Sequence, residues 1–316
     1  MRCDLTQARI MADSPFRILI IMLLAATAAL AGVKPDRIDQ PSYADEIEKW
    51  RKARAQEMAG EEGWLSLVGL FWLTPGQNRF GSDPSNEIPL PKNKAPRQAG
   101  TLRLENGLVR LDVKPGVVIT SEGKAVTSIT LQSDADGKPT RLALGTLSFH
   151  VIKRGERLGL RVKDSQNPAR FRFAGIETYP LNPKWRIEAR LEAYDPPKQI
   201  PIANVLGMID DQPSPGAVVF EVDGKSYRLD AIQEKGSNQL FIIFADKTNG
   251  RATYGAGRYL YTAAPGADGK LIIDFNKSEN PPCAFTSYAT CPLPPRQNRL
   301  PFSVEAGERK YATSQH

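Results

Sequence analysis

Three side chains near the C-terminal end of the chain have the chemistry of catalytic residues. Asp274 ends an alternating apolar segment, Arg258 follows the small residues Gly255-Ala256-Gly257, and Cys283 stands further on in a proline-rich segment. A carboxylate can act as a general acid or base, a thiolate can act as a nucleophile, and a guanidinium can bind an anionic group. Asp274, Arg258 and Cys283 are therefore candidate catalytic residues of a hydrolase-type enzyme.

The alternative to catalysis is a pocket in which aromatic and polar side chains converge. The uncharged stretch at 64–73 is the most hydrophobic one after residue 31. It predicts either a buried strand pair or hairpin in the core, or an aromatic wall of a pocket. Ligand pockets are mostly apolar with a few convergent polar groups. The candidate ligand-binding residues are Trp64, Phe71, Trp72, Tyr254, Arg258, Asn276 and Asn280.

Basic residues crowd the segment 154–172, where they alternate with apolar residues. They are Arg154, Arg157, Arg161, Lys163, Arg170 and Arg172. The pattern favours a solvated face of a sheet, because charged side chains are mostly exposed. The alternative is a basic groove for anionic ligands.

The composition excludes several classes of protein. The chain has 316 residues, of which 41% are hydrophobic and 24% charged, with a formal net charge of +7. These are globular proportions, and the mean hydropathy of −0.37 excludes a protein with many membrane spans. The histidines are His150 and His316, which argues against a histidine-rich metal site and against a Ser-His-Asp triad. We expect no metal and no cofactor. The modest charge and the lack of a reader motif argue against nucleic-acid binding.

One helix is expected, near the N-terminal end. Ser42 and Asp45 have the spacing of a capping box, and Gly60 is a typical helix end. A linker and this amphipathic helix together span residues 32–62. Between the two ends, side chains recur with the helical period at Tyr43, Ile47, Trp50, Arg54 and Met58.

From residue 101 onward the hydrophobic pattern has the period of β-strands. Asn106-Gly107 and Asp223-Gly224 each separate two alternating segments, which is a strong hairpin signal. Further strands are expected at 148–154, 158–162, 170–173, 185–194, 240–244, 259–262 and 271–275. We predict an all-β region at 63–316, a mostly antiparallel sandwich or barrel. A division into two β subdomains would fall near 175–183.

The first 31 residues have the pattern of a secretory signal peptide. Arg2, Arg9 and Arg17 accompany an apolar segment that ends in Ala29-Leu30-Ala31, a typical cleavage site. We expect cleavage before Gly32 and export to a bacterial periplasm. No later segment is apolar over a length that spans a bilayer.

Cys283 and Cys291 are the cysteines that follow the signal peptide. Their spacing is wider than that of a zinc finger and differs from a C-x-x-C redox pair. An even number of cysteines in an exported protein favours a disulfide. It would close the proline-rich loop at 276–301. The alternative is a reactive Cys283 thiolate beside Arg258 or Arg296.

Several motifs near the C-terminus resemble a widespread prokaryotic family of unknown function. They are Thr253-Tyr254-Gly255-Ala256-Gly257-Arg258, Asp274-Phe275-Asn276, Asn280-Pro281-Pro282-Cys283-Ala284-Phe285-Thr286, Cys291-Pro292-Leu293-Pro294-Pro295 and Asn298-Arg299-Leu300. The stretch at 64–73 is similar to the N-terminal signature of the same family. The sequence departs from the family pattern at Ser278-Glu279 and Ser287, where Ala-Tyr and Pro are expected. The resemblance implies no activity and no catalytic residues.

The favoured function is that of an exported β protein that binds a small or envelope-derived ligand. A hydrolase-type enzyme with a site around Arg258, Asp274 and Cys283 is one alternative. A protein for envelope assembly or interaction is another. The sequence carries no signal for an oligomeric state.

Overall fold

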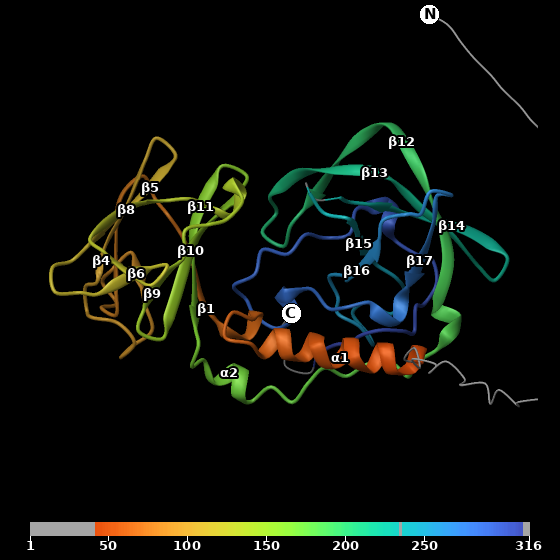
Figure 1. Ribbon diagram of the computed structural model, residues 1–316, viewed down its shortest axis with the longest axis horizontal. Coiled ribbons are helices and arrows are strands. Elements are labelled where there is room, and N and C mark those ends of the chain that lie inside the picture. The colour runs from red at the N-terminus through yellow and green to blue at the C-terminus, as the bar shows by residue number, and fades with distance from the viewer. Residues whose placement is uncertain (1–41, 234–235, 312–316) are drawn as a thin grey trace, which may run out of the picture. The chain divides into compact units, whose positions relative to one another are not determined.

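The computed structural model describes residues 42–233 and 236–311. The predicted signal peptide at 1–31 and the linker up to residue 41 lie outside these residues. Most of the described elements are β-strands that pair antiparallel, with one long helix at the N-terminal end (Figure 1). The predicted fold class is confirmed. Within the described ranges, no helix has both the length and the apolar character needed to cross a membrane.

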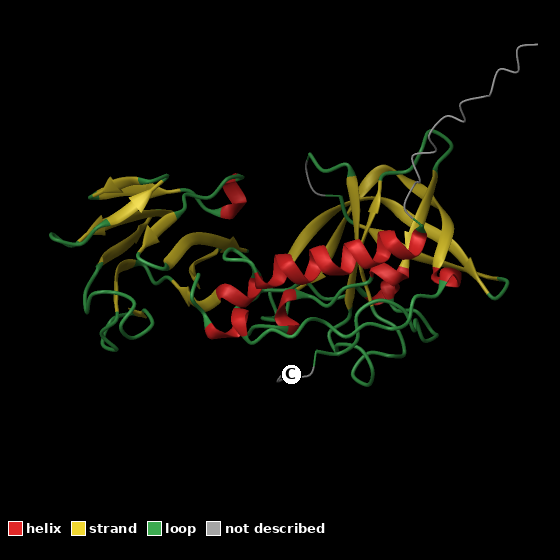
Figure 2. Cartoon of the chain, turned by 60° about the horizontal axis from the view of Figure 1, so that its bottom comes forward, coloured by secondary structure: helices red, strands yellow, loops and turns green. Residues whose placement is uncertain are grey.

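Helix α1 (Tyr43–Ala59) begins at the predicted capping box. The Oγ of Ser42 accepts a hydrogen bond from the backbone N–H of Asp45, and the carboxylate of Asp45 accepts one from the backbone N–H of Ser42, both at 3.2 Å. These bonds satisfy donors that a helix start otherwise leaves free. Figure 2 shows α1 lying along the second of the two β bodies described below. Its buried residues are Ile47, Arg54 and Met58.

The first β body is a sandwich of two sheets around one core. One sheet has the strand order β1-β11-β10-β9-β6-β7, and the other has the order β3-β2-β4-β5-β8. Its strands are β1 (Leu67–Trp72), β2 (Gly76–Gly81), β3 (Ile88–Pro89), β4 (Gly100–Glu105), β5 (Leu108–Val113), β6 (Ile119–Ser121), β7 (Lys124–Val126), β8 (Ser128–Leu131), β9 (Leu142–Leu144), β10 (Leu147–Arg154) and β11 (Arg157–Asp164), with the short helix η2 (Asp134–Asp136) before β9.

The hydrophobic stretch at 64–73 does not fold back on itself. The short 3-10 helix η1 (Trp64–Ser66) leads into the single strand β1. β1 pairs with β11, far along the chain, so the predicted local strand pair or hairpin is wrong.

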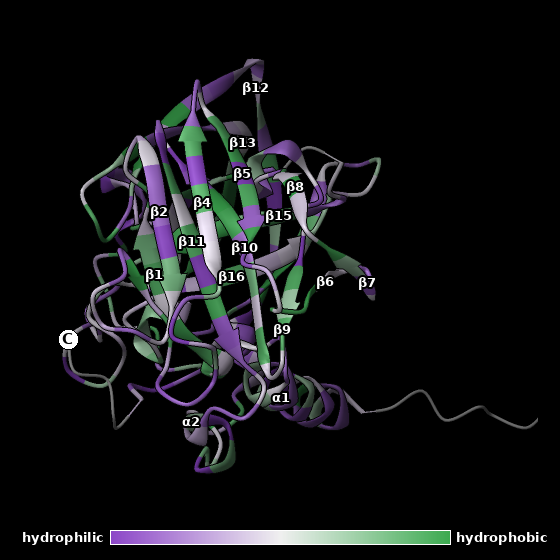
Figure 3. Cartoon of the chain, turned by 90° about the vertical axis from the view of Figure 1, so that its left-hand side faces the viewer, coloured by the Kyte–Doolittle hydropathy of each residue, from purple (hydrophilic) through white to green (hydrophobic). Residues whose placement is uncertain are grey.

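Strand β11 divides its side chains between two environments. Leu158, Leu160 and Val162 belong to the core of the first body. Arg161 lies on the opposite face, because successive side chains of a strand point to opposite sides of the sheet. Its cross-strand partner on β10 is His150. Figure 3 shows comparable changes between hydrophilic and hydrophobic colours along β4 and β5.

The second β body resembles a barrel. A four-stranded sheet has the order β14-β13-β12-β17, and β15 pairs with β16. Two backbone hydrogen bonds of 2.8 Å between Ile232 and Phe241 join the end of β14 to β15, and the Oγ1 of Thr262 in β16 donates to a carbonyl of β17 at 2.7 Å. The strands are β12 (Arg186–Ala203), β13 (Ile209–Val222), β14 (Lys225–Ala231), β15 (Gln239–Phe244), β16 (Arg258–Ala263) and β17 (Lys270–Asp274), preceded by η3 (Pro183–Trp185).

The hairpin of β15 and β16 also presents two faces. Leu240, Ile242 and Leu260 belong to a hydrophobic core of the second body. Phe241 of β15 is paired with Tyr261 of β16 on the opposite face, where Phe241 packs against a further hydrophobic cluster that includes Ile243 and Tyr259. The second face of the β15–β16 hairpin therefore packs on this cluster, whereas Arg161 lies on the face of β11 away from the core of the first body.

Both predicted hairpin turns are confirmed. Asn106 and Gly107, between β4 and β5, have φ angles of 52° and 76°. Asp223 and Gly224, between β13 and β14, have φ angles of 50° and 72°. These are the two left-handed residues that a type I′ turn requires.

Two segments differ from the predicted strands or loops. The segment 170–173 was expected to be a strand but overlaps the short helix α2 (Pro168–Phe171), because Asn167 caps its start and Pro168 favours a first helical turn. The proline-rich segment has no strand among its described residues. It carries the short 3-10 helices η4 (Phe275–Lys277), η5 (Pro282–Ala284) and η6 (Arg296–Asn298).

Candidate functional site

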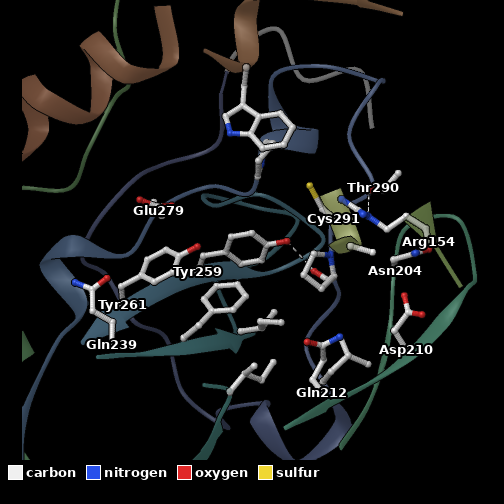
Figure 4. A pocket seen from close by; sticks show the side chains of 18 of the residues that line it. Arg154, Asn204, Asp210, Gln212, Gln239, Tyr259, Tyr261, Glu279, Thr290 and Cys291 are labelled. Atoms are coloured by element: carbon white, nitrogen blue, oxygen red, sulfur yellow. Dashed lines mark hydrogen bonds between the residues drawn. The ribbon is translucent and has the colours of Figure 1, made fainter. Parts of the chain in front are cut away.

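A cavity of about 990 Å³ lies against the outer faces of the two β bodies. Its walls come from the β10–β11 hairpin, from α1 and η1, from β12, β13, β15 and β16, and from the loop at 276–301. Figure 4 shows side chains from these elements converging on it. The cavity therefore combines the basic segment of the first body with the aromatic hairpin of the second.

Arg161 is a buried cation of this cavity. Its side chain is 6% exposed, and its guanidinium lies 5.3 Å from the centre of the Trp64 ring. In the described part of the chain, no carboxylate oxygen lies within 4.0 Å of this guanidinium, and its Nε–H has no acceptor. Burial and the neighbouring Arg154 lower the pKa of Arg161 to about 10, so the group is charged at neutral pH. A buried charge without a partner is costly.

The polar residues near Arg161 differ in whether their side-chain donors have hydrogen-bond acceptors. The Nη1 of Arg154 lies 2.9 Å from the carboxylate of Asp134, and its Nε–H donates to Thr290 at 3.0 Å. Asn204 is 5% exposed, and its Nδ2 has no acceptor among residues 42–233 and 236–311. Arg161 and Asn204 thus both bring unused donors to the lining.

Aromatic rings form the apolar wall of the cavity. The Phe241 ring stacks on Tyr261 with centroids 4.8 Å apart and planes at 14°, and it meets Tyr259 edge to face at 4.9 Å. Trp50 of α1 and Trp64 of η1 add two further rings. Such a wall suits a flat or apolar body of a ligand.

An acidic cluster stands where α1 meets the cavity. The Nε of Arg54 lies 3.3 Å from a carboxylate oxygen of Glu279 and 3.3 Å from one of Glu308, and its Nη2 donates to the carbonyl of Asn280 at 3.0 Å. Burial raises the pKa of Glu279 to about 7, and it also raises the pKa of Glu308. Glu279 lines the cavity.

His150 lies opposite Arg161 and is 8% exposed. Burial, followed by the charge of Arg161, lowers its pKa to about 4, so the imidazole is neutral near pH 7. His316 lies outside the described residues. In the described ranges no three His, Cys, Asp or Glu side chains stand close enough to hold a metal ion.

The structure distributes the predicted aromatic ligand-binding residues over different places. Trp64 lines the cavity. Phe71 packs against the core of the first body, and the Trp72 ring is covered by the guanidinium of Arg157 at 4.3 Å. The three rings therefore do not form one wall.

Arg258 is enclosed by the protein. Its side chain is 0% exposed, its Nη2 lies 2.7 Å from the carboxylate of Asp246, and it donates to the carbonyls of Val304 and Ala306. Tyr254 is also buried. Because its charge is matched inside the molecule, Arg258 fastens the C-terminal segment to β16 and does not line the cavity.

The predicted residues that follow β17 also hold segments of the chain together. The hydroxyl of Tyr43 in α1 donates to both carboxylate oxygens of Asp274, at 2.9 and 3.0 Å, and the Nδ2 of Asn276 donates to that hydroxyl at 3.0 Å. The backbone N–H of Asn280 donates to Glu308 at 2.6 Å. Asp274 thus docks α1, whereas Arg258 pairs with Asp246 and Cys283 contacts Cys291. The three candidate catalytic residues have separate partners.

The predicted disulfide is not formed in the structure. Cys283 and Cys291 are buried free thiols, and the backbone N–H of Cys283 donates to the Sγ of Cys291 at 3.1 Å. The sulfur of Cys291 is an acceptor in a hydrogen bond and not a bonding partner. This thiol contact lowers the pKa of Cys283. Cys291 lines the cavity and Cys283 is not among the lining residues.

Several residues of the cavity are absent from the predicted site. Arg161 belongs to the basic segment that was interpreted as a solvated face, and its surroundings agree with the alternative of a basic groove. Arg54 fell on the packing stripe of the helix, and Glu279 stood out as a departure from the family pattern. The alternation of β11 could have placed Arg161 on the face away from the core, but the elements that bury it come from distant parts of the chain.

The match to a family model concerns the second β body. Residues 171–309 match the model of a family described as a protein of unknown function (DUF1684). This segment contains the motifs from Thr253 to Leu300 and the aromatic rings of β15 and β16, but neither Arg161 nor Trp64 nor α1. No curated protein matches the chain.

Two solved structures are similar to parts of the chain. An uncharacterised protein of Haloarcula marismortui, solved by solution NMR, is 30% identical, covers 47% of this chain and 82% of its own, and has a TM-score of 0.39. The crystal structure of the FhaA FHA domain complexed with the intracellular domain of Rv3910 is 17% identical, covers 30% of this chain and 97% of its own, and has a TM-score of 0.22. The part of the chain that resembles a known family thus resembles one described only as of unknown function.

Proposed function

We propose that this protein binds a small organic acid with an apolar or aromatic body in the cavity around Arg161. The observation that carries the proposal is the buried guanidinium of Arg161, which lines a cavity of about 990 Å³ and has no carboxylate partner among the described residues. A carboxylate of the ligand would supply that partner through charge-assisted N–H···O bonds. The unused Nδ2 of Asn204 is a second donor for the same end of the ligand.

The remaining walls support an apolar or aromatic body for the ligand. Phe241, Tyr259 and Tyr261 form one face, and Trp50 and Trp64 stand on other parts of the lining. The volume of about 990 Å³ falls in the range of pockets for small molecules. Burial of the ligand's apolar surface would provide affinity, while Arg161 would fix its orientation.

Isothermal titration with a matched pair of probes tests this proposal. We expect 3-phenylpropionate to bind the unmodified protein at least about tenfold tighter than 3-phenylpropan-1-ol, since hydrogen bonds to charged groups contribute more than neutral ones. In Arg161→Gln this difference should disappear. Arg110→Gln is the control, because Arg110 is a largely exposed arginine of β5 and does not line the cavity. Equal binding of the acid and the alcohol, or an Arg161→Gln variant that keeps the preference, would overturn the proposal.

We also propose that the protein is exported and that the ligand is met outside the cytosol. The support is the residue pattern at 1–31, which falls outside the described residues. N-terminal sequencing of the protein from a periplasmic fraction should begin at Gly32. A chain that keeps residues 1–31 and stays in the cytosolic fraction would contradict export without bearing on the cavity.

A further inference from the structure

We propose that the ligand is a zwitterion, an organic acid that also carries an ammonium group, with its acid at Arg161 and its ammonium at Glu279. This extends the proposed function, on which it rests, by naming the second charged group of the ligand.

The acidic cluster at α1 has more negative than positive side chains. Glu279 and Glu308 share the single guanidinium of Arg54, each at 3.3 Å. No other cation lies within 4.0 Å of either carboxylate among the residues that the structure describes. When both carboxylates are ionised, two negative charges face one guanidinium, and an unmatched buried charge favours the arrival of a cation.

Of the two carboxylates, that of Glu279 faces the cavity. Glu308 is 1% exposed, and one of its carboxylate oxygens accepts the backbone N–H of Asn280 at 2.6 Å. Glu279 lines the cavity together with Trp50, and Arg54 is its one ion-pair partner in the described ranges. An ammonium group that enters the cavity would therefore meet Glu279.

An excess of positive charge lies in another part of the same cavity. Arg161 is a buried cation with no carboxylate within 4.0 Å in the described part of the chain, and Arg154 is its neighbour. Figure 4 shows Glu279 and Arg154 on opposite sides of Tyr259. A ligand with one anionic and one cationic end would match both charges, whereas a simple acid would leave Glu279 without its cation.

The ionisation of Glu279 supports the proposal and predicts a pH dependence. Burial raises its pKa to about 7, Arg54 opposes this, and Glu308 and Glu57 add to it. The backbone of Glu279 is hydrogen-bonded to Tyr259, whose hydroxyl has a pKa raised well above its usual value by burial and stays neutral. Below about pH 7 Glu279 takes up a proton and loses its attraction for an ammonium group.

The test compares probes that differ by one charged group. By titration calorimetry at pH 8, we expect glycyl-L-phenylalanine or L-alanyl-L-phenylalanine, whose charged ends are separated by a peptide unit, to bind at least about tenfold tighter than 3-phenylpropionate, and 2-phenylethylamine to bind weakly. In Glu279→Gln the zwitterion should lose this gain, while the affinity for 3-phenylpropionate stays the same. In Arg161→Gln the affinities for the zwitterions and for 3-phenylpropionate should all fall.

The outcomes separate the two proposals. If both zwitterions bind no tighter than 3-phenylpropionate, and the latter still depends on Arg161, the ammonium site is wrong and the acid site stands. If the affinity for 3-phenylpropionate is unchanged in Arg161→Gln, the proposed function itself is wrong. Should Glu279→Gln fail to fold, the unmodified protein still decides, because the gain from the ammonium group must shrink between pH 8 and pH 5.5. A gain that is constant over this range would contradict the role of Glu279.

Discussion

Two buried arginines of this protein stand in opposite situations. Arg258 is 0% exposed and pairs with Asp246 at 2.7 Å, with the carbonyls of Val304 and Ala306 as further acceptors. Arg161 is 6% exposed and has no carboxylate within 4.0 Å in the described part of the chain. Burial of an arginine is therefore not in itself a sign of function. What separates a structural cluster from a candidate site is whether the protein supplies the counter-charge.

The largest effect on stability is expected when Arg258, the arginine with an internal partner, is removed. Arg258→Met leaves Asp246 buried without a cation, and we expect the free energy of unfolding to fall by about 3–5 kcal/mol. Urea denaturation measures it. The double variant Arg258→Met/Asp246→Asn should recover part of the loss. A loss below about 1 kcal/mol in the single variant would show that the cluster is not structural.

A second test concerns another structural contact, the hydrogen bond that docks α1 on Asp274. Tyr43→Phe removes the hydroxyl that donates to Asp274, and we expect a loss of about 1.5–3 kcal/mol, since the acceptor is charged. Tyr288→Phe is the matched control, because no hydrogen bond of its hydroxyl is found in the described ranges. Equal losses in the two variants would argue against a specific role for Tyr43.

The pH dependence of the unfolding free energy tests the ionisation of Glu279 at the acidic cluster of the cavity. The folded pKa of Glu279 is about 7, above its ordinary value of 4.5. Between these values the folded protein holds a proton that the unfolded chain has released, so stability falls as the pH rises. The slope is at most about 1.4 kcal/mol per pH unit. Urea denaturation at pH 5 and pH 7 should show a smaller fall in Glu279→Gln, and an identical fall would contradict this assignment.

The smallest expected effect is the one that separates Arg161 from Arg258. Arg161→Met removes a cation that no carboxylate depends on, so the unfolding free energy should change by less than about 1 kcal/mol or should increase. Urea denaturation in the absence of added ligand measures this. A loss as large as that in Arg258→Met would mean that Arg161 has a structural partner and is not reserved for a ligand.

The local elements of the fold could be predicted because their signals are local. The capping box at Ser42 and the two left-handed turn residues at Asn106-Gly107 act on their immediate neighbours, and both appear in the structure. The same local reasoning fails for 170–173, where two alternations are too short a pattern to outweigh a capping Asn167 and Pro168.

The candidate site could be predicted only in part. The residues of the C-terminal motifs, such as Arg258 and Asn276, are ones that the protein uses to hold its own segments together, and a distinctive motif does not reveal that use. Arg161 and Glu279 acquire their unusual state from burial by α1, the first body and the loop at 276–301, which are far apart in the sequence. Trp64 was found because an uncharged aromatic stretch is a signal of its own.

The most direct test of the account is a crystal structure of the protein with bound 3-phenylpropionate. We predict that the carboxylate lies within hydrogen-bond distance of the guanidinium of Arg161 and that the phenyl ring rests against Phe241 or Tyr261. A ligand bound away from this cavity, or Arg161 paired with a carboxylate of the protein itself, would contradict the account.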